Sequence, residues 1–374
     1  MTHDYLAFVD SSNAAERAGD AGSALEYHQG IPMFRRSAHC ATLAQLADLA
    51  QEMTPWLWAR WAAYQCTRAE DPGSKSCVVT ERALDYTIRM FHQDAMARTY
   101  AEGGDPIPVV ARVVGEDWVY HQVCTYELGG LECFLDTMAT GRLAAESGLA
   151  RRWVGARVGG YRIESTSPGR LVVRDLAEDR PRELLDLGAR LHADADGWLI
   201  GRVVPSGTSP ALMFDTRPLG VDRRTATDAS TGDRRGAWVT ALDLAIRDGR
   251  VDPAILQSED RELVTDVGNL DLLERGTEPG ALAGARDRLA GGRDEIGRAA
   301  YRILRAAAEG SFGGDEEAPY VAAAVVNAHG YAEARRQLAR PENRAGWEHW
   351  SRLVPEPARG RLLHLADLSR ASAA

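Results

Sequence analysis

Lysine is nearly absent from this 374-residue sequence, in which Lys75 is the single lysine among 44 basic residues. Any reaction that needs a lysine Schiff base or a phosphate-clamping lysine must therefore use Lys75. A serine, Ser74, precedes it where the phosphate-cradling loop of nucleotide-binding proteins has glycine. The sequence thus excludes that loop and leaves few lysine-dependent mechanisms open.

Four further motifs of catalysis and ligand binding are missing from the sequence. They are Gly-x-Ser-x-Gly, His-Glu-x-x-His, Gly-x-Gly-x-x-Gly and the Asp-rich calcium loop. Their absence excludes the corresponding hydrolase, zinc-protease, dinucleotide-binding and EF-hand interpretations. We therefore expect no cofactor, and no spacing in the sequence selects a metal site.

Cysteine is scarce and lacks the spacing of a disulfide or metal framework. The five cysteines contain no Cys-x-x-Cys pair and are Cys40, Cys66, Cys77, Cys124 and Cys133. The first ten residues show no basic start followed by an apolar stretch, so no secretory signal is expected. The most apolar tract, 321–326, is far shorter than the ~20 residues of a membrane span. These features predict reduced thiols, a cytoplasmic location and no membrane partner.

The charge is acidic and unevenly distributed, with a net value of −10. Residues 1–150 carry 11 basic and 20 acidic side chains, whereas residues 151–222 carry 11 and 10. An acidic surface repels nucleic-acid backbones, so binding of nucleic acid by the first segment is disfavoured. The preference for arginine, alanine and glycine resembles the usage of a GC-rich bacterial genome.

Residues 1–150 are dominated by helical periodicity. Apolar residues from Leu43 to Met53 recur at i, i+3, i+4 and i+7, which is typical of one apolar helix face. We expect further helices over 80–101 and 106–128, because a glycine pair follows each of them. This half is predicted to be a helical bundle or a short solenoid.

The start of the chain predicts a helical hairpin over residues 8–32. Gly19-Asp20 separates two helical stretches, and the second begins with Ala24-Leu25-x-Tyr27-His28. This block resembles the turn and second helix of a tetratricopeptide repeat, which implies a helix–turn–helix unit. No matching block follows about 34 residues later, so a repeat array is not indicated. No family is indicated for the whole chain.

The pattern changes near residue 153 from helical to β periodicity. Short alternating or β-branched runs separated by turn residues predict strands over 158–164, 170–175, 183–187, 197–204 and 210–216. Five strands in about 65 residues suggest a small antiparallel barrel over 151–222.

Helical patterns return after the predicted barrel. Polar and small residues over 223–236 predict a linker, and residues 237–374 predict a C-terminal helical domain. The expected fold class is therefore α+β. It consists of an N-terminal helical bundle, a small barrel-like module and a C-terminal helical domain.

The best chemical constellation lies in the segment from Asp117 to Glu127. On one helix His121 and Cys124 are i, i+3 neighbours, and Asp117 precedes His121 by one turn. This spacing permits a Cys–His nucleophile pair or two metal ligands, with a distant residue such as His92, Cys133 or the His39-Cys40 pair completing the metal site. The alternative is that the histidine and cysteine are packed core residues on the apolar face of the helix.

An aromatic cluster lies at the start of an earlier predicted helix, which begins at Trp56 after Thr54-Pro55. Trp56, Trp58, Trp61 and Tyr64 fall within nine positions and cover more than one helix face. Such a cluster either packs between helices or lines a groove for a ligand or partner. We expect some of these side chains to reach the rim.

The predicted barrel carries arginines near strand ends, with aromatic residues between them. The arginines are Arg157, Arg162, Arg170, Arg174, Arg182 and Arg202, and the aromatic residues are Tyr161, Trp198 and Phe214. Small barrels can bind nucleic acid through such surfaces. Acidic residues nearly cancel these arginines, so nucleic-acid binding by residues 153–220 is the weakest interpretation.

The sequence favours two other functions over nucleic-acid binding. The first is a cytoplasmic bacterial interaction or adaptor protein that binds a protein or peptide through the N-terminal helical surface. The second is an enzyme in which His121 is the base, Cys124 the nucleophile or ligand, and Asp117 or Glu127 orients the imidazole. The sequence indicates no oligomeric state.

Overall fold

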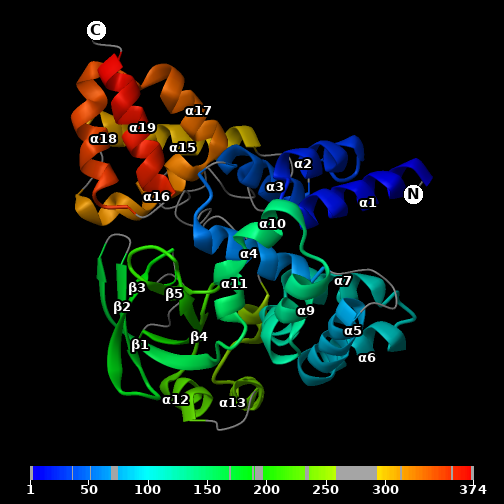
Figure 1. Ribbon diagram of the computed structural model, residues 1–374. Helices are drawn as coiled ribbons and strands as arrows, with labels where there is room; N and C mark the ends of the chain where they lie inside the picture. Colours follow the sequence, from blue (N-terminus) through cyan, green and yellow to red (C-terminus); the bar gives the residue numbers. More distant parts are fainter. Residues whose placement is uncertain are drawn as a thin grey trace.

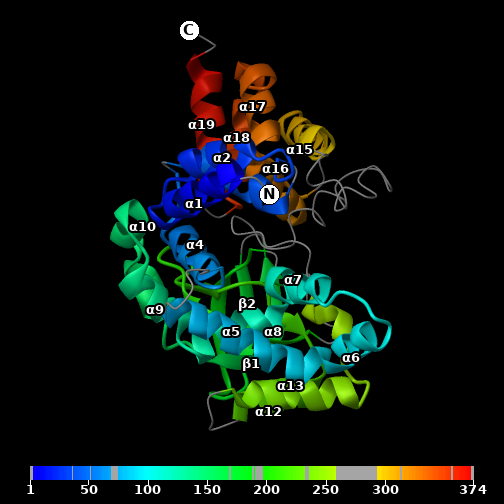
Figure 2. The ribbon, with the colours of Figure 1, turned by 90° about the vertical axis from the view of Figure 1, so that its right-hand side faces the viewer.

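The computed structural model describes residues 3–371 except 36, 51, 69–74, 168–169, 188, 190–196, 232–235, 258–292, 312–313 and 355–356. Helices lie toward both ends of the chain and a closed barrel lies between them, so the predicted α+β class is confirmed. Figures 1 and 2 show the C-terminal helices beside the first three helices at one end of the molecule. The barrel lies toward the other end.

The N-terminal part is helical as expected. Its α-helices are α1 (His3–Arg17), α2 (Ala21–Gly30), α3 (Ala38–Leu49), α4 (Pro55–Cys66), α5 (Lys75–Thr87), α6 (Gln93–Ala101), α7 (Ile107–Glu116), α8 (Trp118–Gln122), α9 (Gly130–Thr137), α10 (Gly141–Glu146) and α11 (Gly148–Trp153). Two π-helical turns, η1 (Ile88–His92) and η2 (Val123–Glu127), interrupt them.

The hairpin predicted at the start of the chain is formed by α1 and α2. Asp20 caps α2, because its Oδ1 accepts a hydrogen bond from Ser23 N at 3.0 Å. Gly19 adopts φ +75°, and a Cβ there would lie 2.6 Å from the backbone nitrogen of Leu143. The turn therefore needs glycine for both its backbone and its contact with α10. The resemblance to a tetratricopeptide repeat stays a prediction.

The middle of the chain forms a closed barrel with one short additional strand. The strands are β1 (Val158–Ser167), β2 (Arg170–Asp175), β3 (Arg180–Leu185), β4 (Trp198–Pro205), β5 (Leu212–Phe214) and β6 (Leu219–Gly220). The first five pair in the order β1-β2-β3-β5-β4, and β4 pairs back with β1 to close the ring. Alternate residues of β2 are buried, as the period of a strand requires. Leu171 and Val173 fill the interior with Leu184, Leu199 and Phe214.

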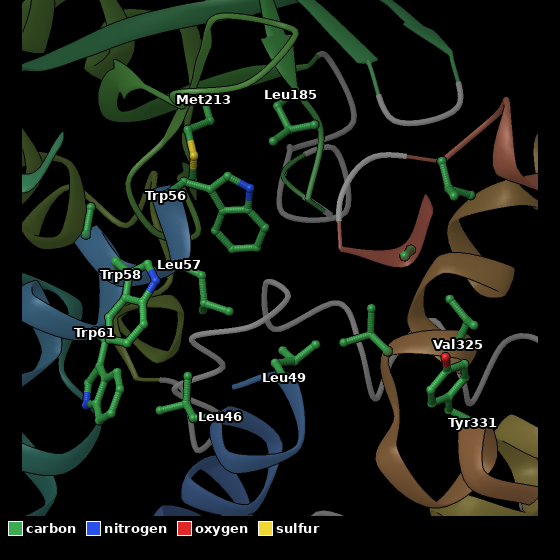
Figure 3. Close-up of a cluster of buried hydrophobic side chains, with 14 of the residues drawn as sticks. Leu46, Leu49, Trp56, Leu57, Trp58, Trp61, Leu185, Met213, Val325 and Tyr331 are labelled. Carbon is green, nitrogen blue, oxygen red and sulfur yellow. The ribbon is translucent and has the colours of Figure 1, made fainter. Parts of the chain in front are cut away.

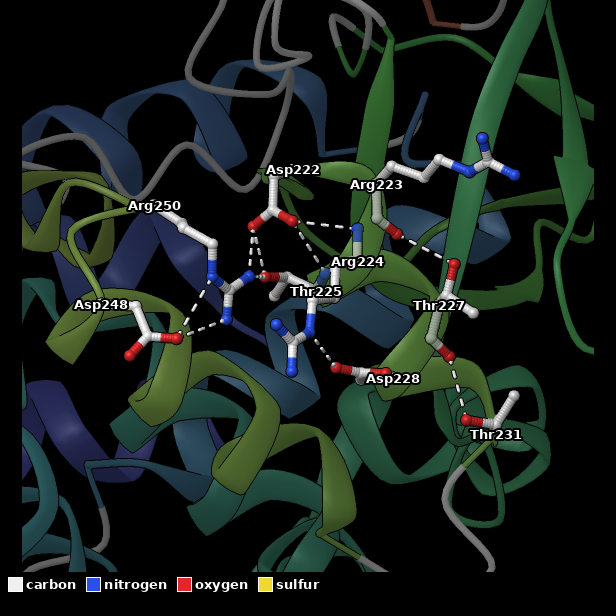
Figure 4. Close-up of polar contacts among 9 residues, drawn as sticks. All are labelled: Asp222, Arg223, Arg224, Thr225, Thr227, Asp228, Thr231, Asp248 and Arg250. Atoms are coloured by element: carbon white, nitrogen blue, oxygen red, sulfur yellow. Dashed lines mark hydrogen bonds and ion pairs between the residues drawn. The ribbon is translucent and has the colours of Figure 1, made fainter.

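Residues 223–231 form helix α12 (Arg223–Thr231) and not the linker expected from their composition. Asp222 begins this helix, because its Oδ1 accepts from the backbone nitrogens of Arg224 at 2.9 Å and Thr225 at 3.1 Å. Arg250 Nη1 lies 2.8 Å from the other carboxylate oxygen of Asp222 (Figure 4). A cap and an ion pair therefore order a segment that looks irregular by composition. Residues 232–235 of the predicted linker lie outside the described residues.

Helices α12 and α13 (Ala237–Arg247) pack on the barrel and the N-terminal helices rather than on the C-terminal domain. α12 crosses β1 at Gly160, where a Cβ would lie 1.9 Å from Ala226 O. Trp238 of α13 meets Trp118 edge to face, with ring centroids 5.3 Å apart. Helices that precede the barrel in the sequence and helices that follow it thus pack together beside it.

The C-terminal part contains α15 (Arg293–Ala308), α16 (Ala318–Val326), α17 (Ala328–Gln337), α18 (Arg344–Ser351) and α19 (Ala358–Ala371). One hydrophobic core joins these helices to α3, α4 and the barrel (Figure 3). The buried Arg361 of α19 pairs with Asp48 of α3, and its Nε lies 3.2 Å from Glu52 Oε2. The two helical parts therefore form one packed body.

None of the helices in the described part of the chain combines the length and the apolar composition that a membrane span requires.

Candidate functional site

The segment from Asp117 to Glu127 does not continue the single helix expected over 106–128. α7 ends at Glu116, the backbone of Asp117 is extended, and α8 begins at the next residue. Asp117 Oδ1 accepts a hydrogen bond from Tyr120 N at 2.8 Å and so caps α8. Cys124 and Glu127 then lie in the wider π-helical turn η2. The helical spacing used to place these side chains on one edge therefore does not apply.

The carboxylate of Asp117 is paired with a different histidine from the one expected. Asp117 is fully buried, and its Oδ2 lies 2.7 Å from Nε2 of His92, at the end of η1. The described hydrogen bonds of this carboxylate are thus with His92 and with the capped backbone of Tyr120. Orientation of His121 by Asp117 is not seen in them.

Cys124 and His121 lie in different surroundings. Cys124 is fully buried, and its Sγ is 3.9 Å from the carbonyl oxygen of Cys66. His121 is half-buried and lies edge-on to the ring of Tyr120 at 5.2 Å. A nucleophilic thiol needs both thiolate character and access, so the burial of Cys124 agrees with its interpretation as a packed core residue.

Glu127 belongs to an ion pair with the barrel. Its Oε1 accepts hydrogen bonds from Nη2 of Arg202 and from Nε1 of Trp238, the second at 2.9 Å. Arg202 is 1% exposed and also donates to Gln122 Oε1 at 2.6 Å and to Ala156 O. Arg202 of strand β4 thus holds the carboxylate of Glu127, which the sequence analysis considered as the group that orients His121.

The same buried network continues to the far side of Gln122. Gln122 Nε2 donates to Asp215 Oδ2 at 2.9 Å, and Arg60 of α4 donates to the carbonyls of Asp215 at 2.8 Å and Phe214 at 3.1 Å. Burial raises the pKa of Asp215, although the Gln122 hydrogen bond and Arg202 oppose this shift. This network of ion pairs and hydrogen bonds connects the N-terminal helices to the barrel.

The aromatic cluster of α4 is part of the hydrophobic core. Trp56 and Trp61 are 0% exposed and Trp58 is 3% exposed, with the rings of Trp58 and Trp61 stacked at 5.5 Å. Figure 3 shows Trp56 beside Met213 of the barrel. This burial agrees with the packing interpretation. We expected some of the four aromatic side chains to reach the surface of the helical bundle, and only Tyr64 is partly exposed.

A second polar cluster, which the sequence analysis did not find, surrounds the fully buried Glu16 of α1. Glu16 Oε1 lies 2.9 Å from Nε2 of His39, and Oε2 lies 2.8 Å from Nη1 of Arg68. Gln65 also donates to Oε2. Tyr64 OH lies 2.8 Å from His39 Nδ1, so the imidazole bridges the carboxylate and the phenol. The hairpin α1–α2 is therefore tied to α3 and α4 by one carboxylate.

The charges of this cluster shift two pKa values. Burial alone raises the pKa of Glu16, but attraction to Arg68 and the hydrogen bond with His39 outweigh it and lower the pKa to about 2. Burial and, to a smaller extent, the neighbouring His39 lower the pKa of His28 to about 4. The rings of the two histidines meet edge to face at 4.9 Å. Glu16 is therefore charged and His28 neutral at neutral pH.

The sequence carries a weak signal for this cluster. Ser12 and Glu16 lie one turn apart in α1 and both are buried, at positions where small apolar residues are expected. Two polar side chains on a buried face require partners. Their partners are separated from them by 12 to 52 residues, so spacing alone does not identify them.

The arginines of the strands are mostly ion-paired. The pairs are Arg170–Glu183, Arg174–Glu164, Arg180–Glu178, Arg182–Asp175 and Arg202–Glu127. Arg162 is the exception in the strands, and its guanidinium carbon lies 5.4 Å from the centroid of the Trp198 ring. Paired charges of this kind attract a nucleic-acid backbone weakly.

Among the described residues, no group of three or more His, Cys, Asp or Glu side chains is placed to hold a metal ion. No known protein family, curated protein or solved structure matches this chain.

Proposed function

We propose that this protein binds a protein or peptide partner through the surface of its N-terminal helices. One observation carries this proposal: of the ten exposed large apolar side chains in the described part of the chain, eight lie within the first 107 residues. They are Leu6, Phe8, Tyr27, Met33, Val78, Tyr86, Tyr100 and Ile107. Concentration of exposed apolar side chains on one part of a protein is typical of an interaction surface.

The hairpin offers the best-defined part of this surface. We call Leu6, Phe8, Tyr27 and Met33 the hairpin surface. The rings of Phe8 and Tyr27 lie 6.4 Å apart, on α1 and α2, and Phe8 passes 3.7 Å from the position of a Cβ on Gly30. Exposed aromatic side chains give large contact area at a small loss of conformational entropy, which favours them as anchors in binding.

The charge around the hairpin surface favours a basic partner. Asp10 and Glu26 are exposed, and neither forms an ion pair within the described residues. Residues 1–150 also carry nine more acidic than basic side chains. A partner segment that combines apolar and basic side chains complements this surface.

The Glu16 cluster supports the proposal by holding the hairpin in one position. A surface that is fixed before binding loses less conformational entropy on association. A cytoplasmic location belongs to the same proposal, because no disulfide links any of the five cysteines, all of which are described.

Co-purification with matched variants tests the proposal. Phe8→Ser combined with Tyr27→Ser is expected to reduce recovery of the partner from the native host about tenfold or more, as loss of two anchor residues does. Leu244→Ser, on the exposed side of α13, is the control and should leave recovery unchanged. Equal recovery with both variants would contradict the assignment of the surface.

A further inference from the structure

We propose that Arg162, Trp198 and Arg223 form a binding site for a phosphate monoester. Arg162 of β1 and Trp198 of β4 are directly paired across the barrel strands, so their side chains share one face. Arg223, the first residue of α12, approaches the same ring. The guanidinium carbons of Arg162 and Arg223 lie 5.4 and 5.7 Å from the indole centroid.

Neither arginine is neutralised by a carboxylate in the described part of the chain. Both are exposed, whereas the neighbouring Arg224 and Arg250 have ion-pair partners. Figure 4 shows the side chain of Arg223 pointing away from the Asp222–Arg250 network. No carboxylate of the described residues therefore competes with an external anion for these two cations.

The arrangement of these cations selects a doubly charged anion. Both guanidinium carbons lie within 6 Å of the centroid of one ring, so they are at most about 11 Å apart, close to the screening length of about 10 Å, and their positive charges repel each other. A phosphate monoester carries a charge of about −1.5 to −2 at neutral pH and relieves this repulsion better than a single carboxylate or a phosphodiester. Each guanidinium carries five N–H donors, and an arginine next to an aromatic ring can donate from them in pairs to phosphate oxygens.

The site is separate from the hairpin surface. α12 and β1 lie at the opposite end of the molecule from α1 and α2 in both ribbon views (Figures 1 and 2). The inference is therefore independent of the proposed partner binding, and either can fail without the other.

Titration of the whole protein with inorganic phosphate at constant ionic strength tests the site. The indole N–H signal of Trp198, assigned by its loss in Trp198→Phe, is followed by NMR. We expect saturable movement of this signal and binding weakened about tenfold or more in Arg162→Gln and in Arg223→Gln. Arg302→Gln, which removes an exposed arginine from α15, makes the same charge change and should bind as the unmodified protein does.

Further probes distinguish the sources of the phosphate. Tighter binding of a phosphoserine peptide than of inorganic phosphate supports the site and identifies a phosphorylated protein as ligand. Equal binding of the two supports a small phosphorylated molecule. The proposal is overturned by an unmoved Trp198 signal, by equal weakening in Arg302→Gln, or by a DNA oligonucleotide that binds more tightly than both probes with the same arginine dependence.

Discussion

Replacement of Glu16 by glutamine probes the buried cluster that fixes the hairpin. The carboxylate accepts hydrogen bonds on both oxygens from His39, Arg68 and Gln65. An amide keeps one accepting oxygen and turns an NH₂ group toward the remaining donors. Lowering of the Glu16 pKa from 4.5 to about 2 corresponds to a stabilisation of the charged form by about 3 kcal/mol, at 1.36 kcal/mol per unit. We therefore expect Glu16→Gln to lose about 3 kcal/mol of unfolding free energy at pH 7.

The pH dependence of stability follows from the same shifts. The pKa of Glu16 is lower in the folded state, so its contribution is present above about pH 4.5 and is lost as the pH falls toward about 2. The lowered pKa of His28 means that the unfolded chain binds its proton first. Stability should therefore already fall between pH 6.5 and about 4. Glu16→Gln should flatten the lower of these two windows. Because the charge of Glu16 raises the pKa of His28, its removal should also extend the upper window to lower pH.

Denaturant unfolding at several pH values, followed by circular dichroism, measures both effects. Glu102→Gln makes the same charge change at an exposed residue and should alter stability little. A Glu16→Gln protein as stable as the Glu102→Gln protein at pH 7 would refute the assigned role of the cluster. An unchanged acid dependence below pH 4.5 would refute the assigned pKa shift.

Three further results are expected. Arg202→Met removes a fully buried cation from its ion pair with Glu127 and should reduce the unfolding free energy by about 3–5 kcal/mol in the same assay. Gly160→Ala places a methyl group 1.9 Å from a carbonyl oxygen of α12, so it should reduce the unfolding free energy by about 1–3 kcal/mol and accelerate hydrogen exchange in α12. Gly155→Ala is the control, because its methyl group meets no atom within 4 Å, and it should change neither quantity. Cys124 should react with a thiol reagent only on unfolding, and later than the half-buried Cys133; equal rates would contradict its burial.

The barrel was predictable because its signals are local. Period-two runs and turn residues place each of the first five strands close to its observed position, and only the two-residue strand β6 is missed. Closure of the ring between β1 and β4 depends on pairing across about 40 residues. No local pattern encodes that pairing.

The candidate site was less predictable because its partners are distant in sequence. From the sequence, Asp117 could lie inside a helix or cap the start of one. In the structure it is an N-cap, and its second carboxylate oxygen is paired with His92. Glu127 pairs with Arg202, 75 residues away, and Glu16 pairs with His39, 23 residues away. Spacing rules describe neighbours within one helix, whereas tertiary packing chooses these pairs.

Site-specific photo-crosslinking tests the central claim most directly. A photoreactive phenylalanine analogue replaces Phe8 on the hairpin surface in one protein and Leu244 on α13 in another, both expressed in the native host. The account predicts a discrete adduct with one protein partner from position 8 and none from position 244. No adduct at position 8 above the level at position 244 would contradict binding through the N-terminal helices.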